Sequence, residues 1–413
     1  VRHICESQID ESLPASVGPR TPREYFRQVA AKTALLFMLS CHIGASENDV
    51  IIRDAQALRR FGYNLGMAFQ VSDDLIGTDY LSSPFYKTGA EYTLHVSAPA
   101  MKQALYFADC HTVCRSFHPF FLRTAAKAGQ ADVVDGIRRA LRVNAGAWGT
   151  RDTLWMALLF DDPDVTGGDY HNLPTSAFLP DLGILTVRDS WDDDAVAARF
   201  KCGPMGGYKA NAWREANRNA DGSLPYLNVA HDHPDANSFV LFGRGAYLAE
   251  TDRYPLDPGK LSSGHNTILV DGVGQAAEGR PEGQDWQQPA SGDMTKMGII
   301  TAVYRLAEDK VVLVEGEAAG SYLPYNRDGK SRPGLDRFRR TFIWVRGDYV
   351  LVFDDVRAPQ PADITWLMQG AELKAVPDSE GRYRLAKKDE YCEFQLVADR
   401  PLQTGIVVST AND

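Results

Sequence analysis

Residues 229–252 of the chain read VAHDHPDANSFVLFGRGAYLAETD, and residues 264–275 read GHNTILVDGVGQ. The runs Ser238–Phe242 and Ala246–Asp252 are rich in aromatic and other apolar residues, and Gly243-Arg244-Gly245 separates them. Two such runs joined by a short glycine-containing segment are typical of a β-hairpin. This stretch therefore predicts antiparallel strands in the C-terminal part of the chain.

The same strand-like sequence pattern extends over the whole C-terminal half. From about residue 184 onwards, short runs rich in Val, Ile, Phe and Tyr alternate with Gly, Asp and Pro. No helical pattern alternates with these runs, which favours an antiparallel sandwich over a parallel sheet. The expected strands are 184–187, 238–242, 246–249, 267–270, 299–306, 311–315, 341–345, 349–353 and 394–397.

The N-terminal part has helical spacing instead. Thr21-Pro22-Arg23-Glu24 is typical of a helix start, and apolar residues recur from Tyr25 to Ile43 before Gly44, where we expect the helix to stop. A second helix is expected from about 48 to 70, and Gly62 and Gly66 in it would let another helix approach closely. Further amphipathic stretches cover 119–128, 131–144 and 151–160.

A length of 413 residues predicts more than one domain. We expect an α+β multidomain chain with helical segments at 1–76 and 77–180 and a large antiparallel β-sandwich at 181–413. The six cysteines are scattered, which favours reduced thiols over a disulfide framework.

The charge and the apolar pattern exclude some classes of function. A net charge of -10 argues against a nucleic-acid-binding protein, although local arginines can still bind an acidic polysaccharide. No apolar run is long enough for a membrane span, and the first residues show no signal peptide. We therefore expect the chain as given to be cytoplasmic.

Three histidines and an aspartate form a candidate metal site. His233 lies just before the first strand of the hairpin and Asp252 at the end of the second, so both should lie at the same end, and His265 starts the next strand. Two imidazoles and a carboxylate suit Zn²⁺. His231 and His233 share a face of an extended backbone, so either can be the ligand and leave the other for chemistry. Glu250 lies on the same strand and is the alternative to Asp252 as the carboxylate ligand.

The whole pattern, with its second histidine followed by Asp-Ala-x-Ser-Phe and its third by Asn-Thr-x-Leu-Val-Asp-Gly, resembles heparinase II/III-like polysaccharide lyases and oligoalginate lyases. The resemblance extends from about Gly77 to the end, and it implies that 77–180 is a truncated remnant of an α/α toroid. It also implies that His231 is catalytic, whereas His233, Asp252 and His265 hold a structural zinc ion.

The resemblance implies cleavage of uronate-containing glycans, either alginate oligomers or heparin- and heparan-type polymers, by β-elimination. Asn237 and Arg244 are the expected substrate-binding residues, and Lys260 is another candidate. In the family a catalytic tyrosine comes from the toroid before the position of Gly77, so activity is expected to be impaired here. The alternative is a non-catalytic carbohydrate-binding sandwich. Related lyases often act in the periplasm or outside the cell, and the sequence does not decide the oligomeric state.

Residues 61–75, FGYNLGMAFQVSDDL, resemble the second aspartate-rich region of trans-polyprenyl diphosphate synthases, within a similarity that covers about 21–76. The resemblance implies a vestigial diphosphate and Mg²⁺ site. The first aspartate-rich motif is missing and Gly77 replaces the third acidic position, so we expect no prenyl transfer and no need for Mg²⁺. The residues of this vestigial site are Lys32, Thr33, Gln70, Asp73 and Asp74.

Overall fold

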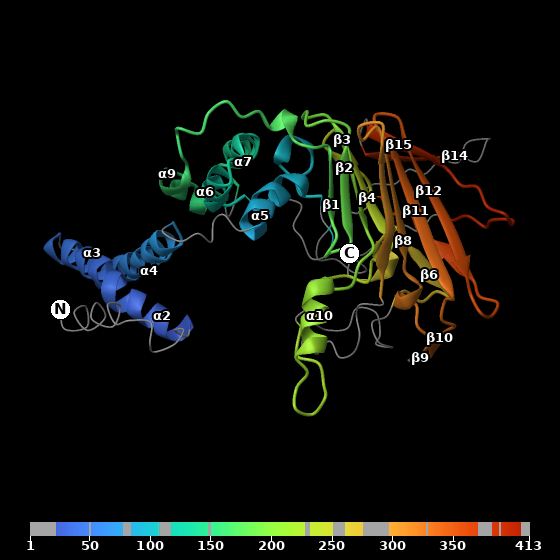
Figure 1. Ribbon diagram of the computed structural model, residues 1–413, viewed down its shortest axis with the longest axis horizontal. Coiled ribbons are helices and arrows are strands. Elements are labelled where there is room, and N and C mark those ends of the chain that lie inside the picture. The colour runs from blue at the N-terminus through green and yellow to red at the C-terminus, as the bar shows by residue number, and fades with distance from the viewer. Residues whose placement is uncertain are drawn as a thin grey trace. The chain divides into compact units, whose positions relative to one another are not determined.

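The chain consists of helices followed by antiparallel sheets, in two compact units, Val1–Lys87 and Thr88–Asp413 (Figure 1). This order confirms the expected α+β class, with N-terminal helices and a C-terminal β-sandwich. The finer division at residues 76 and 180 stays a prediction. The computed structural model describes residues 22–48, 51–76, 84–105, 107, 117–147, 150–227, 232–250, 261–275, 297–327, 329–370, 382–387 and 390–405.

The first unit is a helical hairpin. Helix α3 and the preceding η2 pack antiparallel to α4, with Ala34 of η2 beside Gly66 and Cys41 of α3 beside Gly62. A Cβ atom at Gly62 would lie 2.5 Å from the carbonyl oxygen of Phe37, so the expected close approach of the helices at these glycines is confirmed. The elements are α2 (Pro22–Val29), the π-turn η2 (Ala30–Ala34), α3 (Leu35–Glu47) and α4 (Ile52–Ile76).

The expected helix stop at Gly44 is wrong. Helix α3 continues to Glu47, and nothing lies within 4 Å of a Cβ atom built on Gly44. Asn48 stabilises the last turn of α3, because its side chain donates a hydrogen bond of 2.8 Å to the Gly44 carbonyl. A glycine ends a helix when it adopts a left-handed conformation, and Gly44 does not.

The surroundings of Gly62 and Gly44 predict that alanine changes the free energy of unfolding in opposite directions at the two positions. Gly62→Ala should lower the free energy of unfolding by ~1–3 kcal/mol, because the added methyl group meets the α3 backbone. Gly44→Ala should raise it by up to ~1 kcal/mol, because alanine favours a helix and meets no neighbour. Thermal unfolding followed by far-ultraviolet circular dichroism measures both. Equal shifts in the two variants would contradict the close packing at Gly62.

The second unit begins with a helical cluster whose buried side chains form their own core, including Leu94, Leu122, Val134 and Ile137. Helix α7 buries one apolar stripe against α6, as the amphipathic spacing of 131–144 predicts. Helix α5 lies within the helical segment expected at 77–180, although its own bounds were not predicted. The elements are α5 (Pro84–His95), η4 (Pro99–Met101), α6 (Phe120–Lys127), α7 (Ala131–Val143), α8 (Thr150–Thr153), η5 (Leu154–Met156), α9 (Ala157–Phe160) and η6 (Tyr170–Asn172).

The first large sheet is an antiparallel meander in the order β1-β2-β3-β4-β5. The β4–β5 hairpin turns at Arg244-Gly245, as expected, and its register shifts by a bulge at Leu241/Phe242. Helix α10 (Tyr208–Ala216) lies in the connection between β3 and β4. The strands are β1 (Ser176–Leu179), β2 (Ile184–Arg188), β3 (Val196–Lys201), β4 (Ser238–Gly243) and β5 (Ala246–Ala249).

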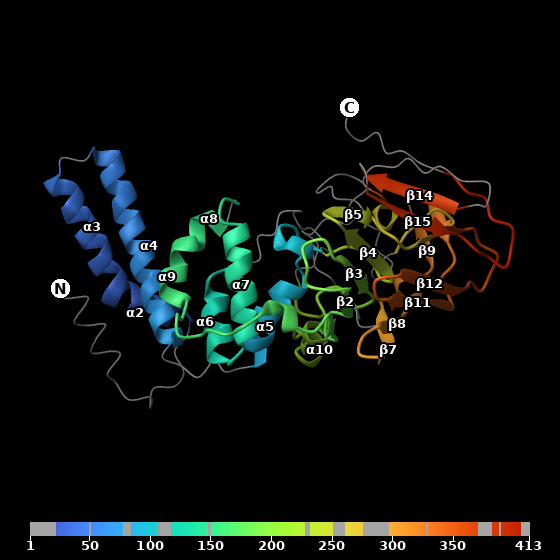
Figure 2. The same cartoon turned by 90° about the horizontal axis from the view of Figure 1, so that it is seen from above.

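The second large sheet faces the first, in the order β12-β11-β8-β7 (Figure 2). Phe342 on β11 contacts Phe200 and Phe239 of the first sheet, with ring centroids 5.8 and 5.7 Å apart. The main core therefore lies between the sheets, as in a sandwich. The strands are β7 (Ile299–Leu306), β8 (Val311–Glu317), β11 (Arg337–Val345) and β12 (Tyr349–Arg357).

Short strand pairs and turns complete the unit. The strand expected at 394–397 lies earlier, because β15 pairs with β14 only as far as Gln395, and Val397 beyond it is exposed. Among the described helices, none combines the length and apolar character that crossing a membrane requires. The remaining elements are β6 (Ile268–Val270) with β13 (Ile364–Trp366), β9 (Tyr325–Arg327) with β10 (Lys330–Arg332), β14 (Arg382–Lys387) with β15 (Glu390–Gln395), η7 (Ser262–Gly264) and η9 (Ala319–Ser321).

Candidate functional site

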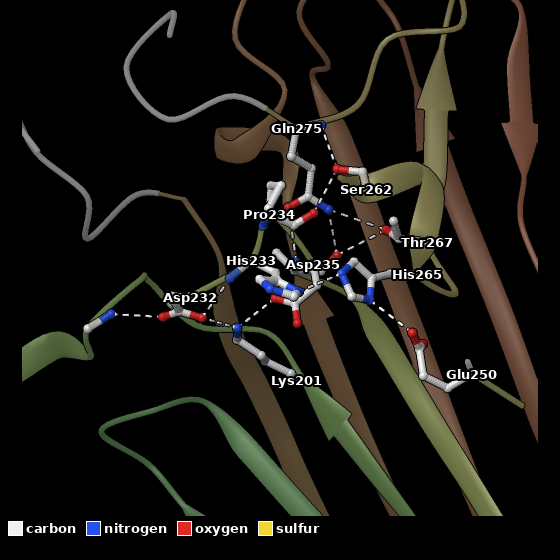
Figure 3. A network of polar contacts seen from close by, with 12 residues as sticks. Lys201, Asp232, His233, Pro234, Asp235, Glu250, Ser262, His265, Thr267 and Gln275 are labelled. Carbon is white, nitrogen blue, oxygen red and sulfur yellow. Dashed lines mark hydrogen bonds and ion pairs between the residues drawn. The ribbon is translucent and has the colours of Figure 1, made fainter. Parts of the chain in front are cut away.

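Two of the expected metal ligands meet at one end of the β4–β5 hairpin (Figure 3). His233 lies in the loop that leads into β4, and His265 lies between η7 and β6. The Nδ1 atom of His233 is 3.0 Å from Nε2 of His265, and each residue is only 6% exposed. The hairpin and the following segment thus bring two imidazoles together, as the sequence predicts.

Glu250 contacts the opposite side of the His265 ring. Its Oε1 atom lies 3.0 Å from Nδ1 of His265, so Glu250 and His233 face different ring nitrogens. Glu250 follows the last residue of β5 with a φ of 109°, which L-residues rarely adopt, and its backbone N–H donates to the Gln369 carbonyl. This placement suits a residue that orients His265, and it does not suit a ligand that shares an ion with His233.

The contact with Glu250 determines what the facing nitrogens can do. A proton on Nδ1 of His265 satisfies the Glu250 carboxylate, which leaves Nε2 of neutral His265 with a lone pair. Either His233 donates a hydrogen bond to that lone pair, or both nitrogens bind one cation. Two nitrogen ligands on tetrahedral zinc, each at ~2.0–2.1 Å from the metal, are ~3.3 Å apart. The distance of 3.0 Å therefore fits a zinc pair after a small movement.

Burial and charge act in opposite directions on His265. Burial alone would lower the pKa of His265, but the Glu250 carboxylate outweighs it, and the pKa is raised above its ordinary value. Buried Asp235 contributes to the same increase. The site is thus an environment that stabilises positive charge.

A buried ion-pair cluster supports the loop that carries His233. Lys201, the last residue of β3, places Nζ 2.6 Å from Oδ1 of Asp232 and 2.6 Å from Oδ1 of Asp235. Burial would lower the pKa of Lys201, but these two carboxylates raise it. With Glu250, three carboxylates surround one ammonium group and the two imidazoles, so the cluster has an excess of acidic groups that favours a bound cation.

Uncharged side chains fix the same loop from the other side. The Gln275 amide accepts from the Ala236 backbone N–H at 3.0 Å and donates to the Ala236 carbonyl at 2.8 Å. Ser262 donates to the Pro234 carbonyl at 2.6 Å, and Thr267 donates to the Ala236 carbonyl at 3.0 Å. Sequence patterns did not predict a role for Gln275, Lys201 or Asp235.

The two expected substrate-binding residues have different surroundings, at opposite ends of β4. Asn237 is fully buried, with a φ of 57°, and its amide donates to the carbonyls of Gly316 and Phe338. Arg244 is exposed in the β4–β5 turn, at the opposite end of β4 from His233, which is ~20 Å of strand away. The substrate roles of both residues stay predictions.

Other expected site residues lie outside what the structure describes. His231, Asp252 and Lys260 are outside the described residues, as are the side chains of Lys32, Asp73 and Asp74. No three His, Cys, Asp or Glu side chains within the described ranges are arranged to hold one metal ion. In the first unit, Thr33 and Gln70 do meet, because the Thr33 hydroxyl donates a hydrogen bond of 2.6 Å to Oε1 of Gln70.

A protein-family model matches the N-terminal part of the chain. The polyprenyl synthetase family model matches residues 1–96, which is less than a quarter of the chain and continues past residue 76. The geranylgeranyl diphosphate synthase of Mycobacterium tuberculosis is 39% identical over 74 residues, and component 2 of the Bacillus subtilis heptaprenyl diphosphate synthase is 33% identical over 73. Each match covers 18% of this chain and 21% of the relative. The chain thus resembles about a fifth of these synthases.

Comparison with solved structures gives the second resemblance. The heparan sulfate lyase HepC of Pedobacter heparinus superposes with a TM-score of 0.45 and 14% identity, covering 97% of this chain and 52% of that one. A structure of heparinase III gives a TM-score of 0.37 and 12% identity, covering 94% and 64%. The resemblance to polyprenyl synthases inferred from the sequence recurs in the family comparison, and heparinase-type lyases are among the solved structures that superpose on the chain. The chain spans about half the length of HepC.

Proposed function

We propose that this chain is a polysaccharide lyase that cleaves uronate-containing glycans, of the heparan or alginate type, by β-elimination. The observation that supports the proposal is the buried pair His233–His265, with ring nitrogens 3.0 Å apart, on a loop directly after His231. In this proposal His231 is the catalytic residue, and His233, His265 and Asp252 hold a zinc ion.

The zinc ion would supply structural order rather than chemistry on the substrate, because it would tie the His233 loop to the segment that carries His265. The described side chains already hold that loop. The Asp232 carboxylate, adjacent to His231 in the sequence, is bound by Lys201 and by the backbone N–H of Gly206. The chain's own ion pairs thus fix the backbone beside the proposed catalytic imidazole.

The proposed reaction needs two proton transfers. A base removes the proton on C5 of the uronate, the C4–O bond breaks, and the departing oxygen takes a proton from an acid. Histidine can act near neutral pH either as that base or as the group that neutralises the uronate carboxylate. The products are an unsaturated uronate at one new end and an ordinary reducing sugar at the other.

The test of this proposal is the formation of unsaturated uronate. Zinc-loaded protein should produce a rise in near-ultraviolet absorbance on alginate, heparin or heparan sulfate, and His231→Ala should abolish the rise while zinc stays bound. His171→Ala is the matched control, because His171 is exposed on the short helix η6, where it contacts Asp169, Asp192 and the Tyr170 ring. This control should leave the rate unchanged.

A non-catalytic carbohydrate-binding sandwich is the second candidate, because the chain spans only about half the length of HepC. It predicts a flat absorbance trace on all three polymers with zinc bound. Isothermal titration with the same polymers would then show saccharide binding that His231→Ala does not abolish. A flat trace together with no binding would exclude both functions.

A further inference from the structure

The outer face of the second sheet carries two complete rows of apolar residues. The strand register places Tyr304, Leu313, Ile343 and Leu351 side by side across the four strands. Their neighbours along the strands form a second row of the same kind. The second row is Leu306, Val311, Val345 and Tyr349, and Phe353 on β12 extends the patch.

These side chains point to solvent, away from the core. Tyr304, Leu306 and Phe353 are 58%, 55% and 57% exposed, and the intervening residues of β11 are Phe342 and Trp344, which are buried in the sandwich. The solvent face of an antiparallel sheet is usually polar. A contiguous apolar patch of this kind marks an interaction surface.

Together with its border, the patch has the area of a small specific interface. With strands ~4.8 Å apart and residues on one face ~6.8 Å apart, the two apolar rows across four strands cover ~260 Å². The mixed and charged rows next to them raise the area of this face to ~590 Å². The smallest specific interfaces bury ~600 Å² per partner.

The border of the patch carries both signs of charge. Arg337 pairs with Asp355 at 2.8 Å across β11 and β12, and Arg339 lies 3.6 Å from Glu315 on β8. These groups are on the same face as the apolar rows, because they continue the same alternation along the strands. A border with both signs is self-complementary, as a two-fold contact between identical surfaces requires.

We propose that this face binds the same face of a second copy of the chain, so that the protein forms a two-fold dimer by packing sheet on sheet. A glycan fits the patch less well, because aliphatic side chains dominate it and its two tyrosines lie on opposite edge strands. Sugar sites need hydrogen-bonding groups beside aromatic rings, and the two apolar rows offer them only at their tyrosines. Interfaces at the low end of the size range are typical of weak association, so we expect a dissociation constant in the micromolar range.

Sedimentation equilibrium of the full chain over a range of ~1–100 μM, with a dissociation constant near the middle of it, is the test of this proposal. Wild type should shift from monomer to dimer across the range. Leu351→Lys on β12 and Tyr304→Lys on β7 should each weaken the dimer at least ~100-fold, since each buries an unpaired ammonium group against its partner. Both residues are exposed in the single chain, so circular dichroism should be unchanged.

Leu158→Lys on α9 is the matched control, since Leu158 is 89% exposed and lies off the sheet. It should dimerise as wild type does. A wild type that stays monomeric at every concentration would overturn the proposal, and so would a dimer that tolerates both lysine variants. A monomer that binds heparan sulfate through Tyr304 would also overturn it and would assign the face to glycan.

Discussion

Replacing Arg340 with leucine should lower the free energy of unfolding of the sandwich by ~3–5 kcal/mol, the cost of removing one partner from a buried ion pair. The Arg340 side chain is fully buried on β11, and its Nε and Nη2 atoms donate to the two carboxylate oxygens of Asp354 at 2.7 and 2.6 Å. Its Nη1 also donates to the backbone carbonyls of Asn237 and Asn266. Leucine would leave the carboxylate without its partner and both carbonyls without this donor.

A second arginine on β11, Arg337, is the matched control. Arg337 makes a similar pair with Asp355, at 2.8 Å, but its side chain is 43% exposed. Arg337→Leu should cost no more than ~1 kcal/mol, because solvent screens such pairs. Urea unfolding followed by tryptophan fluorescence reports on both variants, since Trp344 and Trp366 lie in the sandwich. Equal losses for the two arginines would refute the special role of the buried pair.

A double variant separates two contributions to the loss of stability, the missing ion pair and the unpaired Asp354 carboxylate. Arg340→Leu/Asp354→Leu should recover part of the stability lost in Arg340→Leu, because it removes the uncompensated carboxylate. Arg340 also bridges the backbone of the His233 loop and the segment after His265. The single variant should therefore weaken zinc binding as well, if the histidine pair holds zinc.

Local sequence patterns predict where the helices and strands of this fold lie better than they predict where each element ends and what it packs against. The apolar runs Ser238–Phe242 and Tyr349–Phe353 mark strands β4 and β12 correctly, because short runs rich in Val, Phe and Tyr favour strands. The expected stop at Gly44 fails because a helix end depends on which groups satisfy the last carbonyls, and here Asn48 does so. Helix α10 was missed, since its nine residues give too short a pattern.

The candidate site shows the same division between local and long-range information. The hairpin rule places His233 and Asp252 at the same end of the β4–β5 hairpin, and Asp252 lies outside the described residues. His265 was expected only at the start of the next strand, and the structure brings it to 3.0 Å from His233. The role of Glu250 depends on which ring nitrogen it faces, and no spacing rule gives that. Lys201 lies about thirty residues away in the chain on β3, so only the sheet order β3-β4 brings it to Asp232 and Asp235.

Removal of His265 should abolish tight zinc binding, whereas Glu250→Gln should only weaken it by ~10–100-fold. The difference follows from the geometry. His265 Nε2 faces His233, where the cation would lie, but Glu250 contacts Nδ1 on the other side and acts only through the orientation of the ring. Asp252→Ala should match His265→Ala, if Asp252 is the third ligand as the family resemblance implies.

Competition with a chromogenic zinc chelator ranks these variants. His171→Ala is the control for loss of an exposed imidazole and should bind zinc as wild type does. If Glu250→Gln lost zinc as completely as His265→Ala, Glu250 would be a ligand, and the ion would have to lie on the Nδ1 side of His265, away from His233. If His265→Ala kept tight binding, the 3.0 Å contact between the two imidazoles would be a hydrogen bond, in which Nδ1 of His233 donates to Nε2 of His265 while Glu250 keeps the proton on Nδ1 of His265.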